Sequence, residues 1–199
     1  MACVHLDPVG MVRTGSYIGI GLLVFAESGL LIGIFLPGDS LLFAAGLLSA
    51  NGFLAPGRLM LVVVAAAILG DTAGYWFGAH LGHTLFTRKN SWLFKREYLE
   101  RTERFYHRYG GRTLVLARFV PVVRTLAPIF AGASSMKYGK FVSFNAIGGL
   151  VWGVGMVALG YWLGAAIPES EAYVLPLALV IVGISFIPIL IKLARGKRI

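Results

Sequence analysis

The chain has 199 residues with 18 basic and 9 acidic side chains, so its formal net charge is +9 at pH 7. Hydrophobic residues make up 57% of it and charged residues 14%, whereas a soluble domain averages about 45–50% apolar and about 25% charged. A single soluble core of this length cannot bury so much apolar surface, and a disordered chain does not carry it. The composition therefore predicts an integral membrane protein of one domain and argues against a water-soluble enzyme.

The excess of basic residues predicts contact with anionic lipid headgroups on the cytoplasmic side of a membrane rather than with nucleic acid. Cys3 is the single cysteine, so neither an internal disulfide nor a cysteine-rich metal site is expected. The N-terminal residues lack a basic region followed by a cleavage site, so no removable signal peptide is expected.

Residues 14–52 form a long apolar stretch that is interrupted by Glu27 and by Pro37-Gly38. One straight helix over this stretch would be roughly 58 Å long, well beyond the bilayer core of about 30 Å. Pro37 removes a backbone donor and Gly38 permits a sharp reversal. We therefore expect a short helix that ends near Glu27, followed by a re-entrant hairpin over about residues 29–50.

Residues 58–86 are predicted to form one spanning helix with Asp71 inside it. Residues 88–112 hold 8 basic and 3 acidic residues, and their apolar residues have a loose helical spacing. This pattern indicates an amphipathic helix on the cytoplasmic membrane surface, with an ordinary charged loop as the alternative.

Residues 113–136 are apolar again but contain Pro121 and Pro128. A second re-entrant hairpin is therefore favoured over a plain spanning helix. A glycine-rich spanning helix is expected over residues 141–167, and a last span over residues 172–191 is followed by a basic tail.

The distribution of Lys and Arg predicts that the 88–112 segment and the C-terminal tail are both cytoplasmic. Two half-repeats are expected, over about residues 14–86 and 113–167. FLP in the first recurs as FVP in the second, and GYWFGA recurs as GYWLGA. The predicted orientation places the halves in opposite senses, as in many secondary transporters. The alternative is that Gly, Tyr and Trp are simply common at membrane interfaces.

Five ionisable side chains lie within the apolar stretches: Glu27, Asp39, Asp71, Arg118 and Arg124. Each costs about 2.5–3.5 kcal/mol at a helix centre on insertion scales, so they are expected to pair, face water or bind a ligand. Arginine can hold a phosphate bidentately, and a carboxylate in an apolar pocket takes up a proton more readily. The combination predicts a site for a lipid phosphate, coupled to a protonatable acid, where the hairpins meet. The alternative is a set of buried salt bridges that lock the hairpins together.

No HExxH, GxSxG or P-loop motif occurs, so no enzymatic activity is expected. His80 and His83 lie three residues apart on one helix face, but no third metal ligand is evident. They are expected at the cytoplasmic interface, and no metal or cofactor is predicted.

Five short sequence motifs contain or lie near the charges and prolines of the apolar stretches: ESG from Glu27, FLPGDSLL, GDxxGY from Gly70, RFxPxxRT from Arg118, and Ala131-Gly132. With them the chain resembles, over roughly residues 14–167, the DedA family of bacterial inner-membrane proteins, which is related to the VTT-domain proteins of eukaryotes. The resemblance implies two opposed re-entrant hairpins in an all-α polytopic membrane protein. It also implies movement of undecaprenyl phosphate or phospholipids between leaflets, dependent on the proton-motive force, and a role in the cell envelope.

The resemblance also implies roles for individual residues. The family's functional acids map onto Glu27 and Asp39, and its arginines onto Arg118 and Arg124. Supporting positions are Asp71, Pro37, Gly38 and Pro121. The expected activity is proton-coupled flipping of undecaprenyl phosphate from the outer to the inner leaflet of the bacterial inner membrane. The alternatives are an energy-independent phospholipid scramblase, a membrane scaffold whose buried charges are only structural and, third, an intramembrane enzyme.

Overall fold

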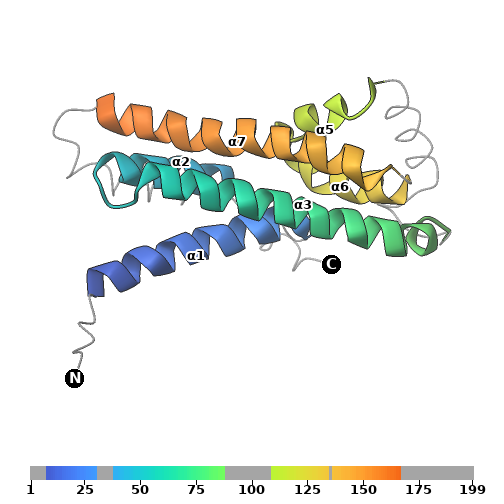
Figure 1. The fold of residues 1–199 in the computed structure, drawn as a ribbon, viewed down its shortest axis with the longest axis horizontal. Coiled ribbons are helices and arrows are strands. Elements are labelled where there is room, and N and C mark those ends of the chain that lie inside the picture. The colour runs from blue at the N-terminus through green and yellow to red at the C-terminus, as the bar shows by residue number, and fades with distance from the viewer. Residues whose placement is uncertain (1–7, 31–37, 88–108, 135, 167–199) are drawn as a thin grey trace, which may run out of the picture. The chain divides into compact units, whose positions relative to one another are not determined.

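The computed structural model describes residues 8–30, 38–87, 109–134 and 136–166. Every regular element in these ranges is an α-helix, which confirms the all-helical prediction for this part of the chain (Figure 1). The helices are α1 (Pro8–Gly29), α2 (Gly38–Ala50), α3 (Pro56–Thr87), α5 (Arg112–Ala117), α6 (Pro121–Ala133) and α7 (Tyr138–Ala166).

The chain divides into two compact units. The first unit comprises residues 1–23, 37–63 and 155–199, and the second comprises residues 24–36 and 64–154. Helices α1, α3 and α7 each contribute residues to both units, and α2 belongs to the first, whereas α5 and α6 belong to the second.

In the first unit, glycines let α2 and the end of α7 approach each other closely. A Cβ atom added to Gly46 would lie 2.5 Å from the carbonyl oxygen of Val157, and one added to Gly164 would lie 2.8 Å from Cβ of Ala50. Such contacts between small residues are typical of helices packed within a membrane. The Tyr17 hydroxyl of α1 accepts a hydrogen bond of 2.6 Å from the backbone nitrogen of Ala55, just before α3.

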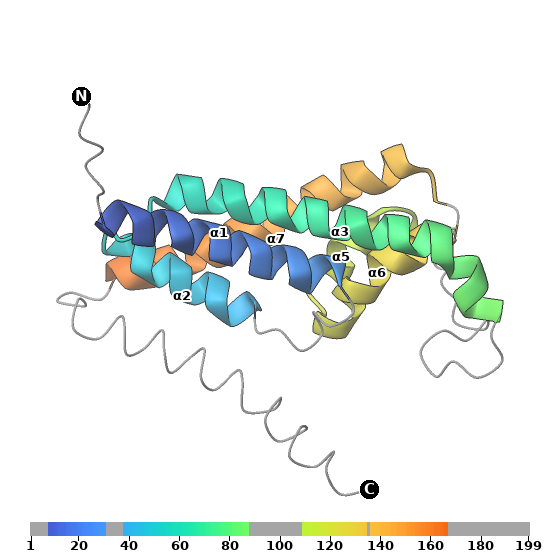
Figure 2. The ribbon, with the colours of Figure 1, turned by 90° about the horizontal axis from the view of Figure 1, so that it is seen from below.

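In the second unit, α6 packs against the later part of α3 beside α5 and the start of α7 (Figure 2). A side chain at Gly132 would collide with the Tyr75 carbonyl, and one at Gly78 would collide with the Ile129 carbonyl, so α3 and α6 nearly touch. The Tyr75 ring stacks on Phe141, with ring centroids 4.6 Å apart. The buried core here is Tyr75, Leu114, Ala117, Ala127, Ala131 and Phe141.

The observed helix bounds confirm several predictions. The helix expected to end near Glu27 ends at Gly29, and the predicted span over residues 58–86 is α3. The expected break in residues 113–136 falls at Pro121, which opens α6 where its missing N–H needs no partner. Pro128 differs, because it lies inside α6 without ending the helix.

Other predictions fall on residues outside the described ranges. They concern Pro37 and the first hairpin's turn, most of the 88–112 segment, the last span over 172–191 and the basic tail. The re-entrant geometry, the inverted repeat and the single-domain organisation stay predictions.

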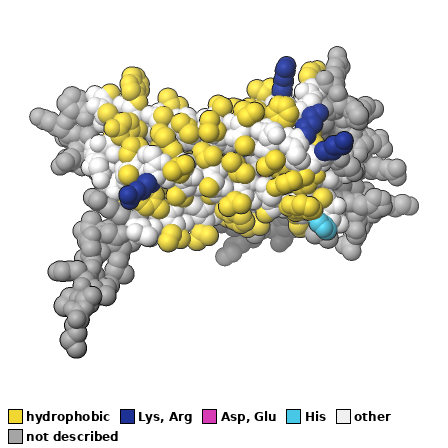
Figure 3. Space-filling model, viewed as in Figure 1, with side chains coloured by type: hydrophobic (Ala, Val, Ile, Leu, Met, Phe, Trp, Pro, Cys, Tyr) yellow, Lys and Arg dark blue, Asp and Glu magenta, His cyan; other side chains and the backbone are white. Residues whose placement is uncertain are grey.

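In the part of the chain that the structure describes, two helical stretches are long and apolar enough to cross a bilayer: Pro56–His80 in α3 and Tyr138–Ala166 in α7. Hydrophobic side chains are also spread over much of the described face that Figure 3 shows. Leu61 in α3 is 73% exposed and Trp162 in α7 is 70% exposed. Such a surface is unfavourable in water and suits contact with lipid.

Candidate functional site

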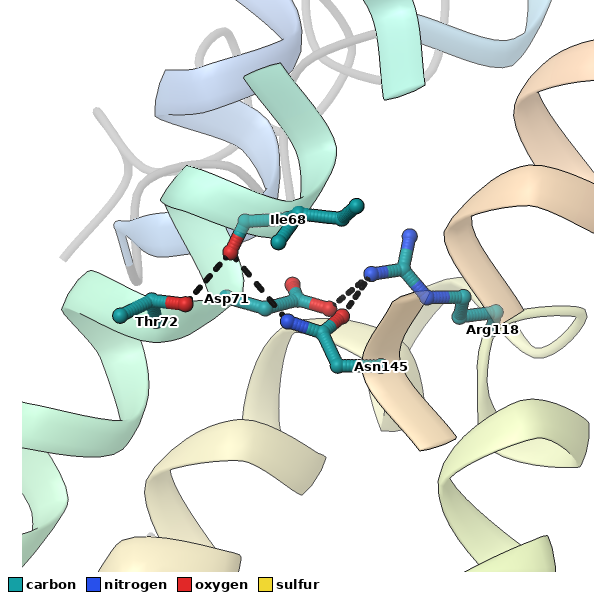
Figure 4. A network of polar contacts seen from close by, with 5 residues as sticks. All are labelled: Ile68, Asp71, Thr72, Arg118 and Asn145. Atoms are coloured by element: carbon teal, nitrogen blue, oxygen red, sulfur yellow. Dashed lines mark hydrogen bonds and ion pairs between the residues drawn. The ribbon is translucent and has the colours of Figure 1, made fainter. Parts of the chain in front are cut away.

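Arg118 and Asp71 form an ion pair in the second unit, buried from solvent. Asp71 lies within α3, and Arg118 is the residue that caps the C-terminus of α5. Each is only 6% exposed. Nη2 of Arg118 donates one hydrogen bond to Oδ2 of Asp71 and another to Oδ1 of Asn145 in α7 (Figure 4). Three segments far apart in the sequence thus meet at one guanidinium group.

The amide of Asn145 is held at both ends. Its Nδ2 donates a hydrogen bond of 3.2 Å to the carbonyl oxygen of Ile68 in α3. The same carbonyl accepts a hydrogen bond of 2.7 Å from Oγ1 of Thr72 (Figure 4). Because Nδ2 faces a carbonyl, Oδ1 must face the guanidinium, so the orientation of the amide follows from its partners.

Arg124 and Glu27 form a second ion pair within the same unit. Arg124 lies in the first turns of α6, and Glu27 lies near the end of α1 with only 1% of its surface exposed. The guanidinium carbon of Arg124 also lies 5.3 Å from the centre of the Trp152 ring in α7. At this separation the face of an indole attracts a cation.

Both arginines line one small cavity. Its walls come from α3, α5, α6 and α7: Asp71, Leu114, Arg118, Arg124, Ala127, Pro128, Phe141 and Asn145. The cavity volume is about 10 Å³, which is enough for about one water molecule. With both carboxylates in place, the cavity therefore has two cationic walls but no room for a phosphate group.

The second unit brings together four of the five predicted charges: Glu27, Asp71, Arg118 and Arg124. Asp39 lies in the first turn of α2, and Gly38 is the first residue of that helix; both belong to the first unit. Arg118 forms its ion pair with Asp71. The sequence alone predicts only a supporting role for this acid.

Sequence reasoning missed Asn145, Thr72 and Trp152. A signal for Asn145 was present, because a polar amide inside a glycine-rich apolar helix is costly in lipid for the same reason as a charge. Asn145 is 2% exposed. Thr72 and Trp152 carry no such signal, since both residue types are common in membrane helices.

Among the described side chains, no group of three His, Cys, Asp or Glu residues could hold a metal ion. His80 is exposed, and its Nδ1 donates a hydrogen bond of 2.9 Å to the carbonyl oxygen of Trp76. The side chain of His83 lies outside the description.

Long apolar helices and buried arginine–carboxylate pairs define an α-helical membrane protein. The VTT domain model matches residues 36–162, more than half of the chain. Protein DedA of Escherichia coli is 41% identical over 179 residues, which cover 89% of this chain and 81% of that protein. The chain belongs to the DedA family of membrane proteins.

Two further relatives agree with this assignment. An uncharacterized membrane protein of Mycobacterium tuberculosis is 41% identical over 187 residues, covering 90% of this chain and 79% of that protein. Inner membrane protein YqjA of Escherichia coli is 37% identical over 150 residues, covering 74% of this chain and 67% of that protein. No solved structure matches the chain.

Proposed function

We propose that this protein flips undecaprenyl phosphate from the outer to the inner leaflet of the bacterial inner membrane, so that the carrier lipid is used again. The observation that carries the proposal is the cavity lined by both Arg118 and Arg124 within a membrane protein. Two guanidinium groups around one space are well suited to a phosphate, because each offers a planar fork of donors and stays charged.

Phosphate binding requires the ion pairs to open. Asp71 and Glu27 occupy donors that the phosphate would use, and the cavity lined by the arginines has room for only about one water molecule. The lipid phosphate therefore takes the place of the carboxylates, and the site alternates between an ion-paired and a lipid-bound form. Restoring the ion pairs then helps to expel the phosphate at the other leaflet.

Protons drive this exchange in the proposed cycle. A proton on Glu27 cancels the charge of its carboxylate and weakens the ion pair with Arg124. Arg124 is then available to bind the phosphate. Asp71 acts on Arg118 in the same way. Asp39 belongs to the first unit, apart from the two ion pairs of the second. Its proposed role as a further proton acceptor therefore rests on the family resemblance.

The proposed architecture has two opposed re-entrant hairpins, related as inverted repeats, with the 88–112 segment and the C-terminal tail in the cytoplasm. In the second hairpin, α5 and α6 are too short to cross a bilayer, with 6 and 13 residues, since a spanning helix needs about 20. Short helices broken at Pro121 are what a re-entrant segment requires.

The test is a flip assay in liposomes that contain the purified protein. Undecaprenyl phosphate is compared with a bulk phospholipid, with and without an imposed pH gradient. The proposal predicts fast movement of undecaprenyl phosphate that speeds up in the gradient and slow movement of the phospholipid. Equal movement of both lipids without any response to the gradient would instead identify an energy-independent scramblase.

A membrane scaffold is the second candidate, because the two ion pairs join four helices of the second unit and are buried. Buried ion pairs are weak stabilisers compared with packed apolar residues, so stability alone is a poor reason to keep them. A protein that binds no phosphate lipid and moves none would be assigned to this class.

A further inference from the structure

Helix α7 offers a fitted surface for the guanidinium of Arg118. Asn145, Gly148 and Gly149 share one helical face, because they are three and four residues apart. A methyl group added to Gly148 would lie 2.9 Å from Cδ and 3.1 Å from Nε of Arg118. One added to Gly149 would lie 3.6 Å from Cζ and Nη1. The arginine side chain therefore lies against the two glycines and ends on the amide of Asn145.

Asn145 and Asp71 hold the same nitrogen in different ways. Each accepts one hydrogen bond from Nη2 of Arg118, so both hydrogens of that nitrogen are used. Asp71 also cancels the charge of the guanidinium, whereas the neutral amide of Asn145 leaves the charge intact. Within the described ranges, both hydrogen bonds of Arg118 leave from Nη2, so Nη1 keeps its donors for an anion.

We propose that Asn145 is the positioning residue that keeps Arg118 in place, without neutralising its charge, after Asp71 has released it. Gly148 supports this role because its lack of a side chain leaves room for the arginine side chain. The inference rests on the proposed function, in which a lipid phosphate takes the place of Asp71. The hydrogen bond from Nδ2 of Asn145 to the Ile68 carbonyl anchors the amide to α3, so its Oδ1 stays in position when the carboxylate leaves.

The first test is spectroscopic and needs no lipid substrate. The full chain is labelled with ¹⁵N-arginine in nanodiscs, and the Arg118 signals are assigned by their loss in Arg118→Lys. Asp71→Ala removes the acceptor oxygens at this position and mimics the released state. There the guanidinium should keep separate Nη signals, and adding Asn145→Ala should average them through free rotation. Ser143→Ala, at an exposed position of the same helix, is the control. Signals that stay separate in the double variant would overturn the positioning role.

The second test measures binding of undecaprenyl phosphate to the unaltered chain, to Asn145→Ala, to Asp71→Ala and to the double variant. Asn145→Ala should weaken binding by about tenfold in the Asp71→Ala background, where the amide of Asn145 alone holds Arg118. In the chain that retains Asp71, the loss should be clearly smaller. A residue that merely braces α3 against α7 would cost the same factor in both backgrounds and would lower the thermal midpoint in parallel, which would contradict the inference.

Two neighbouring glycines give an independent pair of variants if Asn145→Ala fails to insert. Gly148→Ala would push against Arg118 and against Cα of Val115, at 3.3 Å, so binding should fall. Gly149→Ala meets its neighbours at 3.4 Å or more and should bind normally, although both changes favour the helix equally. Equal binding by the two variants would remove Gly148 from the positioning role.

The two tests also separate this inference from the proposed function. If the unaltered chain binds no undecaprenyl phosphate, the proposed function is wrong, and the arginine spectra still decide whether Asn145 holds Arg118. If the chain binds the lipid but the spectra of the double variant are unchanged, the function stands and the role of Asn145 is refuted.

Discussion

Arg124 donates a hydrogen bond to Glu27 across 97 residues of sequence, and the glutamate is 1% exposed. The bond joins the end of α1 to the start of α6 within the second unit. Arg118 and Asp71 make a matching connection between the end of α5 and the middle of α3. Each arginine is therefore held by a carboxylate from another helix, and in the proposed cycle each carboxylate releases its arginine when the lipid phosphate binds.

Replacing the acids by amides separates a proton role from a scaffold role. Glu27→Gln and Asp39→Asn keep the size and polarity of each side chain but cannot titrate. We expect both variants to fold and insert at normal levels, to retain lipid binding and to lose gradient-driven movement of undecaprenyl phosphate. Flip rate against an imposed pH gradient, expression level and thermal stability are measured together. Stable variants with a full gradient response would remove these acids from proton coupling, and variants that fail to fold would favour the scaffold.

Replacing arginine by lysine tests bidentate binding of the phosphate. Arg124→Lys and Arg118→Lys keep the positive charge but lose the planar fork of donors. Loss of one hydrogen bond between charged groups is worth about 1.5–3 kcal/mol, so the flip rate should fall at least about tenfold while the protein still folds. Arg112→Lys, at an exposed position of α5, should behave like the unaltered chain. Normal transport by both buried variants would mean that a positive charge is sufficient.

Engineered cysteines test the re-entrant geometry of α5 and α6. Tyr109 and Lys137 flank these helices and are exposed, and the natural Cys3 is first replaced by serine. Tyr109→Cys and Lys137→Cys should both react with a membrane-impermeant reagent from the cytoplasmic side. Labelling of the two positions from opposite sides would show that the segment crosses the membrane.

Two glycines test the close contact between α3 and α6. Gly132→Ala would place a methyl group against the carbonyl oxygen of Tyr75, so we expect the free energy of unfolding to fall by about 1–3 kcal/mol. Gly139→Ala in α7 has nothing within 4 Å of the new atom and should be neutral or stabilise the helix by up to about 1 kcal/mol. Unfolding followed by tryptophan fluorescence compares the two, and equal effects would argue against the tight contact.

The positions of the helices followed from local properties of the sequence. The apolar run of residues 58–86 is long enough to span a bilayer, and it is helical from Pro56 to Thr87. The break at Pro121 follows from the missing N–H of proline, which suits a helix start and not a helix centre. Pro128 shows the limit of this reasoning, because its buried position inside α6 tolerates a proline that the isolated sequence would not favour.

The sequence by itself also singled out the buried charges, because the cost of placing Glu27, Asp71, Arg118 and Arg124 among apolar residues depends only on their neighbours in the chain. It did not determine how they pair. Which carboxylate reaches which guanidinium depends on the helices that lie side by side, and these come from segments as far as 97 residues apart. Only the tertiary structure assigned Asp71 to Arg118 and set Asn145 against the same nitrogen, because hydrogen bonds require atoms within about 3 Å, a condition set by packing and not by local sequence.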